Sequence, residues 1–381
     1  MLDMDRARET FDAAEDFTVG IEEEFALVDP ESHALVQRFE ELERAAREDD
    51  LLAELVAGEL ISSEIEVRSP KGDTFAEALA GQRAGTARLT RLALDHGTVL
   101  GSTGAHPWSP WQEQRIIDTE HYRRLDEGLR YVAWRNNTFS LHVHVGVRGA
   151  DRAIRVCDRL RALLPELLAL SANSPFLDGR DSGLASARSQ LFTRSFPRCG
   201  VPDVFGSFAA YGSYVDLLQR TNSIVEQTQL WWSVRPHHRF GTVEVRIADA
   251  QTAAEHSGAL AGLLVACVAQ AALDDDEGAA PVPPPNRLIE ENLWRAIRYG
   301  LDGKLIDLDR GEEFPAAALA DRLLAWTAPA RALLGIDSEL PEQNGTQRQR
   351  RALGEGRSLE DVYAAEVAET MRSHAPAKVA S

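Results

Sequence analysis

Four short segments of the sequence place charged side chains at every second position. In FTVGIEEEFALV at 17–28, Glu22 and Glu24 alternate with Ile21 and Phe25. Alternate side chains of a β-strand point to opposite faces. Each segment therefore predicts a strand with one apolar face and one face of glutamate, histidine or arginine. The other three segments are LISSEIEVRSP at 60–70, SLHVHVGV at 140–147 and GTVEVRIAD at 241–249.

The charged faces carry residue types that bind metals and phosphates. Glutamate oxygens suit Mg²⁺ or Mn²⁺ better than zinc, and arginine can bind phosphate through two parallel hydrogen bonds. Glu22 and Glu24 lie roughly 7 Å apart on one face, which is unfavourable unless a cation or an arginine lies between them. The pattern favours a divalent-metal site on the sheet.

A simpler explanation applies to each strand taken alone, because a half-exposed sheet has a polar outer face anyway. Such faces usually mix Thr, Ser, Lys and Gln, whereas these four concentrate Glu, His and Arg. Glu23 falls on the apolar side of its strand and must reach an edge or a partner. The sequence has no glycine-rich phosphate loop, so metals and arginines would have to hold a nucleotide.

Composition limits the classes of partner. The 381 residues carry a formal net charge of −19, which repels nucleic acid and anionic membranes. Three widely spaced cysteines predict free thiols in a reducing compartment. The acidic N-terminal segment does not resemble a secretion signal, and no run of roughly 18 apolar residues predicts a membrane span. We expect a cytoplasmic protein without nucleic-acid or membrane partners.

Helical periodicity and the distribution of prolines predict the organisation. We expect a single catalytic domain over 1–381, with a core at about 17–300, a helical C-terminal extension at about 301–372 and a frayed tail at 373–381. Asp151 is the expected N-cap of its helix. The predicted helices are 39–56, 74–96, 151–172, 253–273, 287–299 and 315–336, and a surface connection is predicted at 274–286.

Several longer motifs carry a family resemblance. They are GIEEEF at 20–25, GSTGAHPW at 101–108, HYRRL at 121–125, LHVHVG at 141–146, LSANSPFLDGRDSGLASAR at 170–188 and RPHHRFGTVEVR at 235–246. With these blocks, which cover about 17–300, the chain resembles the second glutamate–cysteine ligase family, also called carboxylate–amine ligases. ENLWRAIRYG at 291–300 is most similar to glutamate–cysteine ligases of salt-adapted archaea.

The resemblance implies a fold and an activity. The fold is α+β, related to glutamine synthetase and guanido kinases, with a largely antiparallel sheet that packs one face on helices and forms the active site on the other. The activity is ATP-dependent formation of γ-glutamylcysteine from glutamate and cysteine through a γ-glutamyl phosphate, with two or three Mg²⁺ (or Mn²⁺) ions. Homodimers are common for this fold, which allows a homodimer here.

The resemblance also assigns roles to individual residues. The metal ligands would be Glu22, Glu24, Glu66, His144 and Glu244. Arg246 and Arg235 would bind the phosphoryl group or a substrate carboxylate, with Glu66 beside them in catalysis. Substrate binding would fall to Arg188, Asn173 and His106, and support behind the ligands to His142 and Glu64. Glu59 is a weaker match.

Other interpretations stay open for several residues. Asn173 could simply end a helix, and His106 could pack a turn. His237 and His238 fall in a predicted loop, where adjacent histidines are more often surface residues. Three alternative functions also remain: the same chemistry with another amine, a metallohydrolase that uses the HxH strand to activate water, or a binding protein without catalysis.

Overall fold

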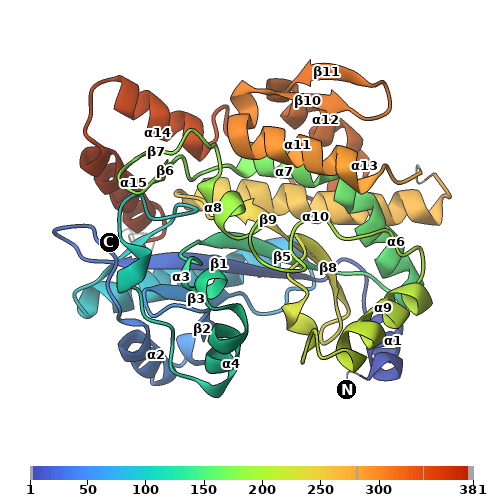
Figure 1. Ribbon diagram of the computed structural model, residues 1–381, viewed down its shortest axis with the longest axis horizontal. Helices are drawn as coiled ribbons and strands as arrows, with labels where there is room; N and C mark the ends of the chain where they lie inside the picture. Colours follow the sequence, from blue (N-terminus) through green and yellow to red (C-terminus); the bar gives the residue numbers. More distant parts are fainter. Residues whose placement is uncertain (1–2, 280–281, 338, 376–381) are drawn as a thin grey trace.

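The computed structural model describes residues 3–279, 282–337 and 339–375 of the chain. Within these residues, the centre of the molecule is a seven-stranded sheet whose paired strands are all antiparallel (Figure 1). Four of its strands are the four predicted from alternating side chains. The order is β2(Val56–Ala57), β3(Glu64–Arg68), β1(Val19–Val28), β5(Ser140–Gly146), β9(Thr242–Asp249) and β8(Val234–His237), and β4(Val99–Gly101) also pairs with β1.

Helices cover the apolar face of the sheet. α10 packs against β5, α7 against β9, α6 against β8 and α3 against β1. The valines that face this layer, such as Val143 and Val245, are fully buried. α10 has the length and mean hydropathy of a membrane span, but 89% of its most apolar window is buried inside the protein. These helices are α3(Phe75–Asp95), α6(Ala150–Leu160), α7(Leu164–Ser171) and α10(Ala254–Asp276).

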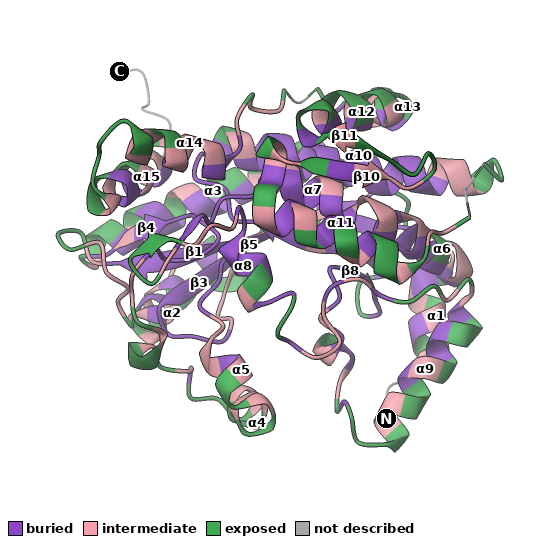
Figure 2. Ribbon diagram, turned by 45° about the horizontal axis from the view of Figure 1, so that its top comes forward, coloured by how far each residue is buried: buried purple, intermediate pink, exposed green. Residues whose placement is uncertain are grey.

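Smaller elements surround this core. Figure 2 shows α4 and α5 as mostly exposed or half-buried segments beside the sheet. The N-terminal and middle helices are α1(Met4–Asp12), α2(Phe39–Arg47), α4(Glu120–Leu129), α5(Tyr131–Trp134), α8(Ala187–Leu191) and α9(Phe208–Arg220). The C-terminal part contains α11(Asn286–Tyr299), β10(Lys304–Asp307), β11(Glu312–Pro315), α12(Leu319–Trp326), α13(Ala328–Leu334), α14(Gly345–Gly354) and α15(Leu359–Ser373). A short hairpin joins β6(Phe176–Leu177) to β7(Arg180–Asp181).

Most predicted helices form, with changes at their ends. Thr74 caps α3 by accepting a hydrogen bond from the Glu77 amide. The predicted N-cap Asp151 is wrong: Gly149 is the N-cap of α6. Asp151 lies in the first turn and accepts hydrogen bonds from the Phe208 amide and Arg8. The predicted helix 39–56 ends at Arg47 and is followed by a 3₁₀ turn.

The C-terminal end is more ordered than the sequence suggests. α10 continues to Asp276, beyond the predicted end at 273, and Arg152 forms a two-pronged ion pair with Asp276. The predicted frayed tail begins inside α15, whose last residue is Ser373. His374 is buried and its ring meets Phe25 edge-on at 5.3 Å. The part of the predicted tail at 376–381 lies outside the described residues.

A β-bulge lies where β5 and β9 cross the middle of the sheet. Leu141 pairs with Ala248 and Val143 with Val245, so two residues of β9 lie opposite His142 alone. A bulge bends its strand and re-aims the neighbouring side chains. Here it brings Ala248 to the same helix-covered face as Val245, and Arg246 between them lies on the open face of the sheet.

Candidate active site

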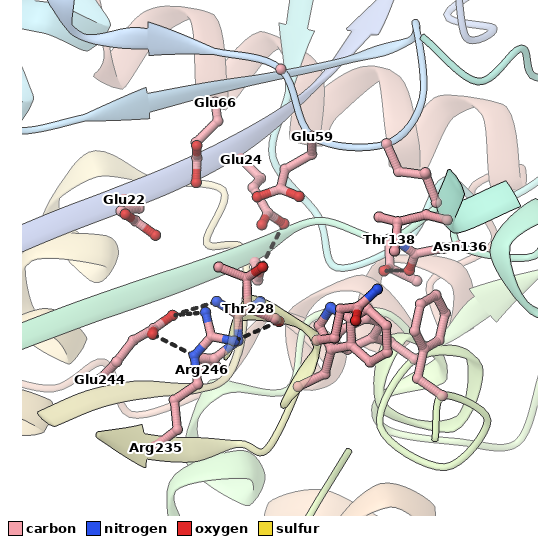
Figure 3. A pocket seen from close by; sticks show the side chains of 18 of the residues that line it. Glu22, Glu24, Glu59, Glu66, Asn136, Thr138, Thr228, Arg235, Glu244 and Arg246 are labelled. Carbon is pink, nitrogen blue, oxygen red and sulfur yellow. Dashed lines mark hydrogen bonds and ion pairs between the residues drawn. The ribbon is translucent and has the colours of Figure 1, made fainter. Parts of the chain in front are cut away.

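The face of the sheet that lacks a helical layer holds a charged cavity of about 430 Å³. Side chains from β1, β3, β5, β8 and β9 line it. Figure 3 shows the glutamates of β1 and β3 on one side and the Arg235, Glu244 and Arg246 group on the other. Nine of the residues predicted from the sequence line this cavity: Glu22, Glu24, Glu64, Glu66, His144, Arg188, Arg235, Glu244 and Arg246.

Carboxylates crowd together on the β1–β3 side. One oxygen from each of Glu24, Glu59 and Glu66 lies within 4.8 Å of the others. Burial and the charge of Glu24 raise the pKa of Glu59 to about 7, and burial together with Glu22 raises the pKa of Glu66 well above its ordinary value. Arg68 pairs with Glu66 and partly offsets this repulsion. These raised pKa values mean that full ionisation of the group needs more positive charge than Arg68 supplies.

Two further groups could hold a metal ion and share ligands with the first. One is Glu22, His144 and Glu244, and the other is Glu22, Glu66 and His142. The Nε2 atom of His144 is buried and has no hydrogen-bond partner among the described residues; it lies 3.4 Å from Glu22 and 3.8 Å from Glu244. An orphaned nitrogen between two carboxylates suits a divalent cation. The donor set therefore fits divalent metal.

The pKa values of the two β5 histidines, His142 and His144, are shifted in opposite directions. Burial would lower the pKa of His144, but Glu244 and Glu22 outweigh it and raise the pKa. The pKa of His142 is lowered, because its burial and the charge of Arg246 outweigh the nearby acids. The Nδ1 atom of His144 lies 3.0 Å from the Thr242 hydroxyl, which fixes the ring orientation. A metal would use the opposite nitrogen.

Paired arginines dominate the β8–β9 side. Arg235 donates from Nε to Glu244 at 2.6 Å, and Arg246 binds the other oxygen of the same carboxylate. Burial would raise the pKa of Glu244, but the two guanidinium groups hold it well below its ordinary value. The Nε atom of Arg246 is buried without a partner. This side can offer positive charge to a phosphoryl group while its own acid stays ionised.

The chain is similar in sequence to a known protein family. The profile of glutamate-cysteine ligase family 2 matches residues 18–363. The chain belongs to this family. A protein of Rubrobacter xylanophilus named "Putative glutamate--cysteine ligase 2-3" is 40% identical over 92% of this chain and 96% of its own length. One from Sorangium cellulosum, named "Putative glutamate--cysteine ligase 2", is 39% identical over 94% of each chain.

Solved structures agree on the fold of this glutamate-cysteine ligase family member. The glutamate–cysteine ligase from Francisella tularensis in complex with AMP has a TM-score of 0.67 at 13% identity, over 97% of this chain and 91% of that one. The bifunctional glutathione synthetase from Pasteurella multocida also gives 0.67, at 12% identity, over 97% of this chain and 54% of that one. The predicted family, ligase class and α+β fold are confirmed.

Two predicted substrate-binding residues of this family member do not line the cavity. The side-chain Nδ2 of Asn173 donates to Ala250 O at 2.8 Å, and the backbone N–H of Asn173 donates to the Asp249 carboxylate at 2.9 Å. The Nε2 atom of His106 lies 2.8 Å from His33 O, and burial lowers the pKa of His106 to about 4. Both side chains bind neighbouring loops, and their assignment to substrate binding stays a prediction.

Arg188 lies at the floor of the cavity and is almost fully buried. It donates to Ile247 O at 3.1 Å and to Arg246 O at 3.0 Å. Its terminal nitrogens therefore hold the bulged strand, and only its Nε atom lacks a partner. We assign Arg188 to positioning Arg246 rather than to gripping a substrate carboxylate.

The adjacent histidines are also not surface residues. His237 is the last residue of β8, lines the cavity and stacks on Phe240 with ring centres 4.5 Å apart. His238 is buried and lies 2.9 Å from the Tyr211 hydroxyl. Burial lowers the pKa of His237 to about 3, which keeps its ring neutral.

Sequence reasoning missed several cavity residues that come from loops and gave Glu59 only as a weaker match, although Glu59 lines the cavity. Glu59 lies between β2 and β3, where no alternation marks it. Asn136 and Thr138 also lie outside helices and strands, Thr228 lies in the short 3₁₀ turn Gln227–Gln229, and all three face the same cavity (Figure 3). The alternation of side chains that predicts a strand does not extend to residues in the connecting segments, so it gives no signal for these positions.

Proposed function

We propose that this family member joins the γ-carboxylate of glutamate to the amine of cysteine at the expense of ATP. The observation that carries the proposal is the meeting of three overlapping carboxylate and histidine groups with the Arg235–Glu244–Arg246 group in one cavity. Glutamates suit Mg²⁺, and arginines suit the phosphoryl group that passes between ATP and the substrate.

A second cavity of about 660 Å³ supports a place for the nucleoside. It borders the charged cavity and shares five lining residues with it, listed here: Glu22, Arg68, His144, Arg239 and Phe240. It surrounds Gly20 at the start of β1. The distance from Gly20 to Glu24 along an extended strand is about 13 Å, so an extended triphosphate fits between the nucleoside cavity and the acid cluster.

The proposed reaction has two steps. A carboxylate oxygen of glutamate attacks the γ-phosphorus of ATP, and ADP leaves. The amine nitrogen then attacks the acyl carbon, a C–N bond forms, and phosphate leaves with the electron pair of the broken C–O bond. Phosphorylation is needed because a carboxylate is a poor electrophile. Bound divalent cations would neutralise phosphate oxygens during both steps.

The chain's own residues supply position and charge. Arg246 and Arg235 would stabilise the charge on the transferring phosphoryl group. Glu244 holds both guanidinium groups in place. Glu22, Glu24, Glu59 and Glu66, with His144, would bind the cations. Arg68 would balance the acid cluster from its edge.

The decisive experiment separates activation from amine transfer. The protein with ATP, Mg²⁺, glutamate and hydroxylamine should release ADP and form γ-glutamyl hydroxamate, because hydroxylamine traps an acyl phosphate without needing a specific amine site. With cysteine, the product should have the mass of γ-glutamylcysteine. ADP release that does not require glutamate would contradict the proposal. Hydrolysis that proceeds without ATP would instead favour the metallohydrolase.

A further inference from the structure

Large apolar side chains line part of the charged cavity. Phe192 and Phe196 have ring centres 4.6 Å apart, and Trp231 meets Phe196 edge-on at 5.4 Å. None of these residues borders the second cavity, where we place the nucleoside. We call this surface the aromatic wall, and its residues are Tyr122, Leu125, Leu129, Phe192, Phe196 and Trp231.

The aromatic wall lies beside the reacting centre. The Arg188 guanidinium is 5.9 Å from the Phe192 ring centre and donates to Arg246 O at 3.0 Å. Thr228 O, three residues before Trp231, accepts a hydrogen bond from Arg235 at 3.0 Å. The wall is thus attached to both arginines that would face the phosphoryl group. A molecule bound on the wall would lie next to the activated carboxyl group.

The wall is larger than a cysteine side chain requires. Trp231, Leu125 and Leu129 are only half-buried, so they present apolar surface to the cavity. Apolar side chains with a few placed polar groups are typical of a ligand pocket. Asn136 and Thr138 provide such groups on the side of the cavity away from Glu22 (Figure 3). The lining is therefore suited to an amine attached to a flat apolar group.

We propose that the amine acceptor range of this ligase extends to amines bearing a bulky apolar, preferably aromatic, group, with cysteine as a small member of the range. The inference rests on the proposed function, because it concerns the second step of that reaction. The amine nitrogen forms the new C–N bond, the C–O bond to phosphate breaks, and the proton released from nitrogen goes to the departing phosphate or to water.

The test compares acceptors on the wild-type protein with ATP, Mg²⁺ and glutamate. Cysteine, alanine, phenylalanine and 2-phenylethylamine are each offered, and hydroxylamine reports activation alone. We expect kcat/KM for an aromatic amine to exceed that for alanine by at least about tenfold. Use of phenylalanine alone would mean that the acceptor carboxylate is also bound. Use of both aromatic amines would mean that the apolar group suffices.

The contrary outcomes are distinct. If hydroxamate and γ-glutamylcysteine form but neither aromatic amine exceeds alanine, the inference on the aromatic wall is overturned and the proposed function stands. If hydroxamate does not form, the proposed function fails and this inference fails with it. The hydroxylamine arm therefore tells the two failures apart.

Variants of the wall complete the test. Leu125→Ala and Trp231→Ala should each lower the ratio of aromatic-amide product to hydroxamate by about tenfold or more. Leu125 is half-buried on α4, so its truncation leaves the core intact. Leu217→Ala on α9 is the control, because Leu217 is 48% exposed and borders neither cavity. An unchanged ratio in both wall variants would show that the acceptor binds elsewhere.

Discussion

The two sides of the charged cavity are built on opposite principles. On the β1–β3 side, the carboxyl groups of Glu24, Glu59 and Glu66 face one another, and the pKa values of Glu59 and Glu66 are raised. On the β8–β9 side, Glu244 lies between Arg235 and Arg246 and stays ionised. The first side is incomplete without an added cation, whereas the second is neutralised by its own side chains. Substitutions on the two sides should therefore have opposite effects on stability, although both reduce catalysis.

The largest expected effect is on turnover, from Glu66→Gln. We expect kcat to fall by about 10²–10³-fold, the range seen when one preorganised electrostatic group is removed. The melting temperature without metal should rise, because the raised pKa of Glu66 means that folding works against its ionised form, and glutamine removes that cost. Paired activity and melting measurements check this. A lower melting temperature would mean that the Arg68 pair, and not repulsion, governs Glu66.

Glu244→Ala should show the opposite sign of stability change. It leaves two buried guanidinium groups without their shared partner, and losing one member of a buried pair costs about 3–5 kcal/mol. Urea unfolding of the metal-free protein measures this cost. Glu244→Gln is the matched control, because it keeps the side-chain shape and one acceptor oxygen. If Glu244→Ala were as stable as the wild type, the view that Glu244 neutralises Arg235 and Arg246 would be contradicted.

Added Mg²⁺ should stabilise the protein through the acid-rich side. A ligand that binds only the folded state raises the melting temperature with concentration. We expect this rise in the wild type and a much smaller rise in Glu24→Gln, with Ca²⁺ compared as a second hard cation. Differential scanning fluorimetry provides the measurement. An equal rise in Glu24→Gln would place the ion on the other side of the cavity.

The smallest expected effect is a shift in pH dependence from Glu59→Gln. The folded-state pKa of Glu59 is raised to about 7, so its ionisation destabilises the metal-free fold as pH rises from its unfolded value of about 4.5 through 7. The stabilisation by Mg²⁺ should consequently grow between pH 6 and pH 8. In Glu59→Gln this growth should be smaller. Melting curves of the wild type and Glu59→Gln, with and without Mg²⁺ at several pH values, measure this difference.

The strand positions were predictable because β-structure has a period of two. That period places Glu22, Glu24, His144 and Glu244 on the polar faces of their strands. It also marked Glu23 as an exception, and the structure gives Glu23 buried partners in Gln82 and Ser257.

The remaining site residues were not predictable in this way. Glu59 lies in a loop, where no periodicity constrains the direction of a side chain. Asn173 and His106 were placed by motif resemblance, which identifies a segment without telling whether a side chain faces the cavity or supports it from behind. The hydrogen bonds from Asn173 to Asp249 and between His106 and His33 O show that these two side chains lie behind the cavity. The aromatic wall combines three distant segments, whose meeting depends on tertiary packing.

Sharing of ligands between the acid groups has a consequence for how ions load. Glu22 belongs to two of the three groups and Glu66 to two. Because one carboxylate then serves neighbouring ions, occupancy at one position alters the affinity at the next. A calorimetric isotherm should therefore deviate from independent identical sites, and the linkage between positions should weaken when either shared glutamate is replaced.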